Sequence, residues 1–248
     1  MDEGQNNGLQ TIRATQEVFD NWRFVLFFVF VNLMVAATLF SHRTIASQFI
    51  LLLIELIALP VMFYLVNVER RVWLMSLLVP ALGLVLVILT RIFDADDNGL
   101  ALFAVIQFVI TSFLIMSIIH FIYMNRVIDF QTIFAAVSLY VLIGLLFARI
   151  YFILDMFAPP LFVDPGREIL MSDYMYYSFV TLTTTGYGDL SEASQIGRMI
   201  SVLEATFGQL YLVVVIALIV GHFSSNLDEH LNVFKGKDGL QHNEKDDK

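Results

Sequence analysis

The 248-residue sequence contains no cysteine and little charge. The absence of cysteine excludes disulfide frameworks, thiolate catalysis and cysteine-ligated zinc or iron–sulfur centres. Only 15% of the residues are charged and 58% are hydrophobic, and the mean hydropathy is +0.76. This composition is too apolar for one water-soluble core and predicts an integral membrane protein. The formal net charge of −9 argues against a nucleic-acid partner.

Enzyme motifs are also missing from the sequence. The five histidines are scattered without metal-ligand spacing, and no Ser-His-Asp order, nucleotide loop or paired-carboxylate motif is present. We therefore expect a protein that is not an enzyme and that needs no organic cofactor.

Six apolar segments are long enough, or nearly long enough, to cross the hydrocarbon core of a membrane. They run from Phe24 to Phe40, Phe49 to Val66, Val72 to Thr90, Leu100 to Met124, Ile133 to Leu154 and Ile196 to Phe223. The polar residues 1–22 carry apolar side chains near helical spacing, which predicts a cytoplasmic or interfacial amphipathic segment. The predicted fold class is an all-α membrane protein with six transmembrane helices.

The segment between the last two spans, Asp155 to Ala193, is too polar and proline-rich to cross a membrane. It contains the apolar, aromatic run Tyr174 to Leu182, which predicts a half-length re-entrant helix. Six spans place both termini on one side, and the basic residues favour the cytoplasm for the N- and C-termini of a multi-pass cell-membrane protein. This topology places five arginines outside or near the outer helix ends: Arg43, Arg91, Arg149, Arg167 and Arg198.

The motif Thr183-Thr184-Thr185-Gly186-Tyr187-Gly188-Asp189 follows the re-entrant run directly. Its two glycines alternate with larger residues and adopt positive φ easily, so that successive carbonyl groups can face one axis. Non-helical backbone at membrane depth is tolerated only where it lines a protein-walled or water-filled path. A simple glycine turn is the alternative, but the half-span helix before the motif and the spanning helix after it argue against a turn.

With this motif in this context, the chain resembles the tetrameric pore-loop potassium channels of the six-helix prokaryotic type. The resemblance implies that the backbone carbonyls of the motif, with one threonine hydroxyl at the inner end, replace the water shell of a potassium ion. The filter residues implied are Thr184, Thr185, Gly186, Tyr187 and Gly188. Potassium ions in this filter are the only bound metal expected. Because one chain supplies one loop, the resemblance implies a homotetramer around a central pore.

The resemblance also implies supporting residues around the filter. The run Asp173 to Thr183 would be the pore helix, whose C-terminal carbonyl end favours a cation in the central cavity. Tyr176 and Tyr177 occupy positions of an aromatic cuff around the filter. Asp189 is placed to accept a hydrogen bond from Tyr176 or from a nearby backbone amide.

The last helix extends the resemblance. Gly208 lies 19 positions after Asp189 and is either a gating hinge or a glycine for close helix packing. One helical face that the resemblance assigns to the cavity lining comprises Gln209, Leu212, Ile216 and Val220. This face has no acid and is largely apolar, which would permit gating by dewetting.

Two acids, Glu55 and Glu204, fall inside predicted spans. A carboxylate at membrane depth suggests a functional role, although we favour structural hydrogen bonding over pH sensing for both. His222, at the cytoplasmic end of the last span, is either a pH-sensitive gate residue or an ordinary solvated histidine.

The fourth predicted span lacks a voltage sensor, because no lysine or arginine stands between Arg91 and Arg126. The predicted organisation is an N-terminal segment (1–22), a peripheral four-helix domain (23–124), a linker (125–132), a pore domain (133–226) and a polar cytoplasmic tail (227–248). We expect the tail to be disordered and too short for a regulatory domain.

These observations together predict a potassium-selective channel that is not voltage-gated, with copies of itself, membrane lipids and potassium ions as partners. One alternative is a non-selective cation channel, because Thr185 stands where the common motif has valine. Another alternative is a non-conducting scaffold or regulatory subunit. A secondary transporter is disfavoured, because paired broken helices and internal repeats are not evident.

Overall fold

The structure is a computed structural model that describes residues 25–36, 53, 54, 56, 59, 60, 70–92, 96–124, 130–157, 160–163 and 166–246. The regular secondary structure of these residues is helical, and an isolated antiparallel bridge joins Phe162 to Glu192. The labelled helices are α3 (Arg70–Ile92), α4 (Asp96–Met124), α5 (Phe130–Phe157), α6 (Met171–Leu182) and α7 (Gln195–Asp246). The predicted all-α class is confirmed for this part of the chain.

Three stretches of helix among the described residues are long and apolar enough to cross a membrane. They are Leu102–His120 in α4, Thr132–Phe157 in α5 and Gln195–Leu218 in α7. Shorter apolar helices occupy Val25–Ala36 and Ser76–Leu86, within the first and third predicted spans. Most of the second predicted span, the N-terminal segment 1–22 and most of the linker lie outside the described residues. The count of six spans therefore remains a prediction.

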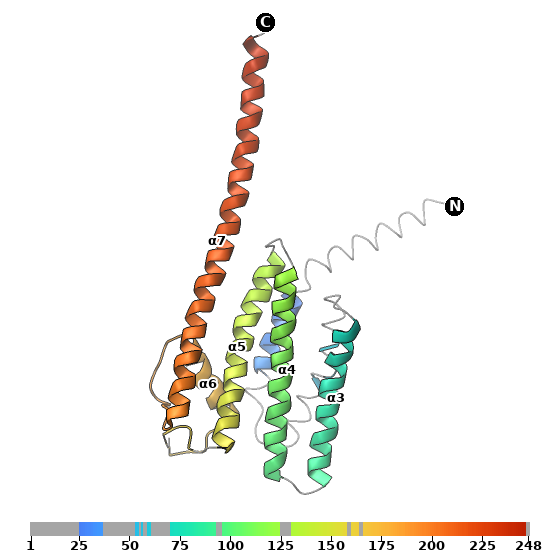
Figure 1. Ribbon diagram of the computed structural model, residues 1–248, viewed down its shortest axis with the longest axis vertical. Helices are drawn as coiled ribbons and strands as arrows, with labels where there is room; N and C mark the ends of the chain where they lie inside the picture. Colours follow the sequence, from blue (N-terminus) through green and yellow to red (C-terminus); the bar gives the residue numbers. More distant parts are fainter. Residues whose placement is uncertain are drawn as a thin grey trace, which may run out of the picture. The chain divides into compact units, whose positions relative to one another are not determined.

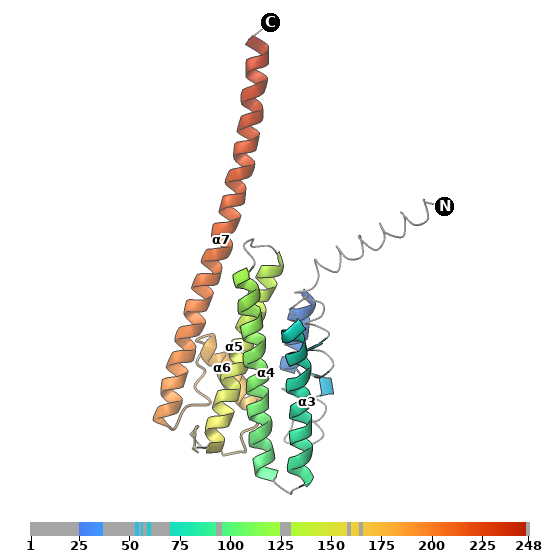
Figure 2. The same ribbon diagram turned by 45° about the vertical axis from the view of Figure 1, so that its right-hand side comes forward.

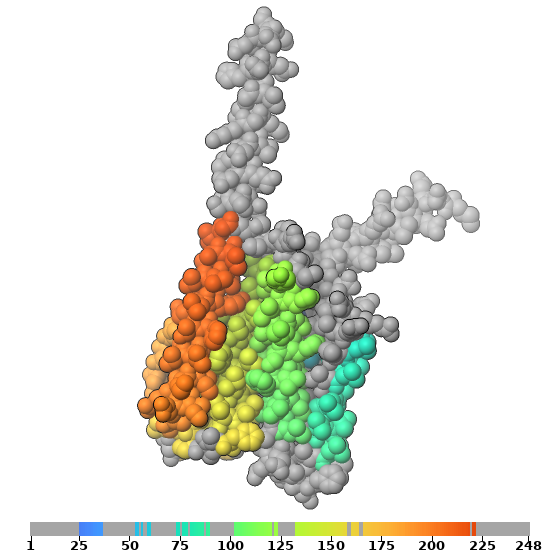
Figure 3. Space-filling model, in the orientation of Figure 1, coloured from blue at the N-terminus to red at the C-terminus, as the bar shows by residue number. Residues whose placement is uncertain are grey.

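The helices pack in chain order, with α3 on α4, α4 on α5 and α5 on α6 (Figures 1 and 2). Ile110 and Leu114 are buried side chains on α4, the helix that packs against both α3 and α5. One side of α4 is visible at the surface (Figure 3). Val109 and Met116 of this helix are exposed. An apolar surface of this kind is typical of a helix that faces lipid.

Arg149 of α5 is buried between the peripheral helices and the pore domain and is only 2% exposed. Its guanidinium donates hydrogen bonds to Gln107 Oε1, at 2.9 Å, and to the Thr111 hydroxyl, both on α4. A buried charge is tolerated only when its donors are satisfied. Arg149 was predicted near an outer helix end, and its role in joining two helices was not predicted from the sequence.

The last helix extends further than expected. Because α7 continues to Asp246, the prediction of a disordered tail is wrong. The tail contains no proline and carries several leucines and lysines, which favour helix. The chain divides into two compact units between Gln209 and Leu210, and the second unit contains the remainder of α7.

Replacing Arg149 tests the contact between α4 and α5. Arg149→Met leaves Gln107 and Thr111 without their charged donor, and each acceptor left unsatisfied costs roughly 1–3 kcal/mol. We expect a lower midpoint of thermal unfolding in detergent micelles, with partial recovery in the triple variant Arg149→Met, Gln107→Leu, Thr111→Val. Arg198→Met, which removes an exposed arginine, should change the midpoint little. Equal midpoints for Arg149→Met and the unmodified protein would contradict the contact.

Candidate functional site

The re-entrant helix α6 begins with a charged cap. The Asp173 side chain accepts a hydrogen bond from the Leu170 backbone amide at 2.8 Å, which satisfies a donor at the helix start. Arg167 donates two hydrogen bonds to the same carboxylate, both at 2.7 Å. These bonds hold the pKa of Asp173 below its usual range. Asp173 also lies in the first turn of α6, where a negative charge favours the helix dipole.

The segments on either side of α6 and the following loop are hydrogen-bonded to each other. The Val163 amide donates to the Ser191 carbonyl at 2.9 Å, and the Ala193 amide donates to the Leu161 carbonyl at 2.8 Å. Asp155, at the end of α5, accepts hydrogen bonds from the Leu161 amide and from a tyrosine of α6, Tyr174. The loop is therefore closed at its base and anchored to α5.

A Schellman motif ends α6. The Thr184 amide donates to the Thr181 carbonyl and the Thr185 amide donates to the Val180 carbonyl, both at 2.9 Å. This arrangement requires a left-handed residue after the helix, a place that glycine usually occupies. Thr184 occupies it with φ of 56°. A β-branched residue in this region is strained, and such strain is concentrated at functional sites.

Positive φ then recurs at every second residue of the loop. Gly186 has φ of 56° and Gly188 has φ of 77°, whereas Thr185 and Tyr187 have negative φ. Because positive φ recurs at alternate residues, successive carbonyl groups can face one axis. The prediction that the two glycines adopt positive φ is confirmed. Thr184 was predicted as a filter residue, but its left-handed conformation was not, because nothing in its residue type signals it.

The two adjacent tyrosines of α6 point to different environments. The ring of Tyr176 stacks on the ring of Tyr187 with 6.3 Å between centroids and 3° between planes. Desolvation and a hydrogen bond to the Asp189 carboxylate raise the pKa of Tyr176. The Tyr176 side chain therefore lies beside the loop, as an aromatic cuff residue would.

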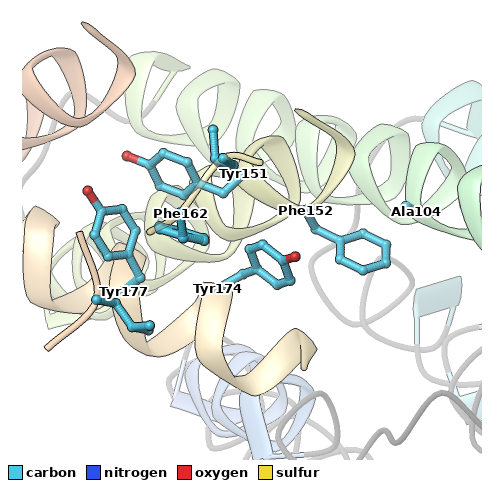
Figure 4. Close-up of a cluster of buried hydrophobic side chains, with 8 residues drawn as sticks. Ala104, Tyr151, Phe152, Phe162, Tyr174 and Tyr177 are labelled. Atoms are coloured by element: carbon cyan, nitrogen blue, oxygen red, sulfur yellow. The ribbon is translucent and has the colours of Figure 1, made fainter. Parts of the chain in front are cut away.

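Tyr177 points away from the loop and is buried in an aromatic cluster between α5 and α6 (Figure 4). It packs edge-on against Phe162 and Tyr151, at centroid distances of 4.7 and 5.0 Å. Its hydroxyl is hydrogen-bonded to Glu192 and to Ser201, at 2.7 Å for Ser201. Tyr177 is therefore part of the scaffold behind the loop. This position differs from the predicted one, in which Tyr177 lies in an aromatic cuff beside the filter.

Glu204 of α7 is fully buried behind α6. Tyr151 of α5 donates a hydrogen bond to one oxygen of its carboxylate at 2.6 Å, and the Ser178 hydroxyl of α6 lies 2.5 Å from the other. The carboxylate thus joins all three helices of the pore domain. The expected structural hydrogen bonding of Glu204 is confirmed. Glu55 lies outside the described residues, and His222 falls within α7.

Gly208 and Gln209 of α7 lie close to the inner end of the loop. A Cβ atom at Gly208 would be 2.4 Å from the backbone oxygen of Leu182, the last residue of α6. Gln209 Nε2 donates to the Thr184 hydroxyl at 3.1 Å. This geometry supports close packing at Gly208 and leaves the hinge role a prediction. The remaining predicted lining residues follow along α7, with Leu212 half-buried and both Ile216 and Val220 exposed.

The loop itself is exposed in the single chain. All residues from Thr183 to Asp189 are exposed, and Tyr187 reaches 70%. Thr183 donates to the Phe179 carbonyl, and its hydroxyl lies 2.9 Å from the Thr185 hydroxyl. Within the described part of the chain, no cluster of three or more acids and histidines could hold a metal ion. Backbone carbonyls and threonine hydroxyls are the groups that the loop offers to a cation.

Substitution of Gly208 tests the close contact between α7 and α6. Gly208→Ala forces the Leu182 carbonyl to move, and overpacking of this kind costs roughly 1–3 kcal/mol. We expect a lower unfolding midpoint in detergent micelles. Gly221→Ala is the matched control, since a Cβ atom there would have no neighbour within 4 Å, and alanine favours helix by up to ~1 kcal/mol. Equal midpoints for the two variants would show that α7 does not approach α6 this closely.

Comparison with known proteins finds a match that covers the segment that contains this site. Residues 139–224 match the family model described as ion channel, the two-transmembrane pore-domain type. This range contains most of α5, all of α6, the loop and the apolar part of α7. Comparisons with curated proteins and with solved structures find no match. Residues 139–224 are therefore similar to an ion-channel domain, in agreement with the predicted resemblance to the pore-loop potassium channels.

Proposed function

We propose that this protein is a potassium-selective channel that conducts ions passively through the loop from Thr184 to Gly188. The observation that carries the proposal is the alternation of positive φ at Thr184, Gly186 and Gly188, directly after the end of α6. A run of carbonyls turned to one side supplies the oxygen ligands that replace the hydration shell of a potassium ion. The Thr184 hydroxyl would complete the inner end of this row.

The exposure of the loop supports a homotetramer. One chain supplies one wall of carbonyls, so that a closed cage requires several copies around an axis. The apolar residues of α7 beside the loop are also uncovered, with Val202 66% exposed and Phe207 58% exposed. A spanning helix with exposed apolar side chains can contact a neighbouring copy as well as lipid. We propose four copies, as the resemblance implies.

The peripheral helices provide no voltage sensor in this proposal. The described helix α4 carries no lysine or arginine, whereas Arg149 is fixed on α5 by hydrogen bonds to α4. A voltage sensor must move several charges through the membrane field. The channel would reside in the cell membrane with both termini in the cytoplasm.

Glycine substitutions test the proposed filter. Alanine at Gly186 or Gly188 must adopt positive φ, which costs about 1–2 kcal/mol per residue, or must turn its carbonyl away from the ion path. We expect purified protein in liposomes to support potassium flux that exceeds sodium flux, and both Gly186→Ala and Gly188→Ala to abolish it.

Gly166→Ala is the matched control for these variants. Gly166 has φ of 71° and no atom within 4 Å of its Cβ position, but it lies before α6 and outside the loop. Alanine at position 166 bears the same backbone strain as alanine at the filter glycines. Because this strain lies outside the loop, the potassium flux of Gly166→Ala should resemble that of the unmodified protein. Potassium flux that survives both filter substitutions would contradict the proposal.

A non-selective cation channel is the second candidate, and the hydrogen bond between the Thr183 and Thr185 hydroxyls favours it. Thr185 stands at the position where the common potassium-channel motif has valine or another apolar residue. Its hydroxyl contact with Thr183 supplies a polar support for the filter that an apolar residue would lack. Thr185→Val removes this contact at nearly constant volume. We expect the ratio of potassium to sodium permeability to change little. A rise of about tenfold, equal to about 1.4 kcal/mol in relative binding, would instead show that the native loop is poorly selective.

A further inference from the structure

The surroundings of Glu204 are compatible with both protonation states of its carboxyl group. Ser178 has a single hydroxyl proton, and its oxygen lies 2.7 Å from the Gly144 carbonyl and 2.5 Å from Glu204 Oε1. When Glu204 is ionised, Ser178 donates to the carboxylate. When Glu204 is protonated, it donates to Ser178, and Ser178 donates to the Gly144 carbonyl. Tyr151 donates to Oε2 in both states, so both are fully hydrogen-bonded.

A row of hydroxyl groups leads from Glu204 to the outer loop. Tyr151 lies 3.3 Å from the Ser201 hydroxyl, Ser201 lies 2.7 Å from the Tyr177 hydroxyl, and Tyr177 contacts Glu192. The hydroxyls of Tyr151 and Tyr177 point to the same side of the aromatic cluster, and that of Tyr174 points away (Figure 4). Glu192 is only partly buried and follows the loop, so that water can reach this end of the row.

The groups that face Glu204 come from each element packed around it. Tyr151 and Tyr140 belong to α5, and Tyr140 interacts electrostatically with Glu204 while its hydroxyl donates to the Leu182 carbonyl. Ser178 belongs to α6, and Ser201 lies on α7 itself. At the far end of the row, Arg198 interacts electrostatically with Glu192.

We propose that Glu204 is a proton-binding site that equilibrates with the outer solution through Glu192, Tyr177, Ser201 and Tyr151 and that controls conduction through the loop. In one passage, Glu192 gives its proton to Tyr177, Tyr177 gives its own to Ser201, Ser201 to Tyr151, and Tyr151 to Glu204. The net result is an ionised Glu192 and a protonated Glu204. The proton arrives on Oε2, so rotation of the Glu204 carboxyl group, which turns the proton toward Ser178, and rotation of the three hydroxyls together reset the row. The regulatory part of this inference rests on the proposed channel function.

The site acts on the filter through charge. Ser178, which contacts Glu204, precedes Thr183 by five residues, which is about 7.5 Å along a helix axis. An ionised carboxylate behind the end of α6 attracts cations to the loop, and the low dielectric of the surroundings preserves this effect. Protonation removes the attraction. Potassium flux should therefore fall several-fold as the outer pH is lowered.

Infrared spectroscopy of the full chain in liposomes tests the site without any need for conduction. A protonated-carboxyl band should grow on acidification in the unmodified protein and should be absent in Glu204→Gln. Glu168→Gln, which replaces an exposed acid of the same outer region, should keep the band. After a rapid drop in pH, Ser201→Ala should slow the growth of the band without changing its final size. A band that persists in Glu204→Gln, or the absence of any titrating band, would overturn the proton site, and an unchanged rate in Ser201→Ala would overturn the route.

Flux measurements on the same liposomes test control of conduction. The side-chain amide introduced by Glu204→Gln can donate to Ser178 and accept from Tyr151 as the protonated acid does, so this variant should conduct at the low-pH level at every pH. An equal pH response in the unmodified protein and in Glu204→Gln would overturn the regulatory role. A titrating band in a protein that carries no potassium would reject the channel proposal and the regulatory role and keep the proton site. Selective potassium flux in a protein that shows no titrating band would support the channel proposal and reject the proton site and its regulatory role.

Discussion

The carboxylate of Glu204 holds the pore domain together, because it is the point at which α5, α6 and α7 are hydrogen-bonded to one another. Its partners lie 26 and 53 residues away in the chain, so the bonds form only when all three helices are in place. An unpaired carboxylate in this dry interior would be strongly unfavourable. The requirement for partners therefore fixes the depth and rotation of α6, and with it the position from which the loop starts.

The end of α6 determines the backbone conformation at the start of the loop. A Schellman motif places Thr184 in a left-handed conformation, and the two glycines continue the alternation outward. Backbone strain of this kind costs of order 1–3 kcal/mol per residue. It persists only where surrounding contacts hold the backbone in the strained conformation. Here the hydrogen bond from Gln209, the ion pair at the start of α6 and the closed base of the loop supply that support. A rigid scaffold behind an exposed loop with alternating positive φ is the basis of the proposed selectivity.

Much of this architecture could be predicted from the sequence, because apolar length, a half-span run and the spacing of two glycines are local features. The helices α4 to α7 begin within a few residues of their predicted positions, and the ion-channel resemblance is confirmed by the family match. The partners of Glu204 and Arg149 could not be predicted, since they depend on contacts between distant segments. The opposite environments of Tyr176 and Tyr177 depend on the rotation of α6, which residue type does not reveal. The helical tail was missed because polar composition alone suggested disorder.

The central claim is that the loop selects potassium by a row of backbone carbonyls. The most direct test is the reversal potential of the current through the purified protein in a planar bilayer, with potassium on one side and sodium at equal concentration on the other. The account predicts a reversal potential displaced far toward the potassium equilibrium potential. A reversal potential near zero would contradict it, because a pore that passes both ions equally does not depend on carbonyl spacing.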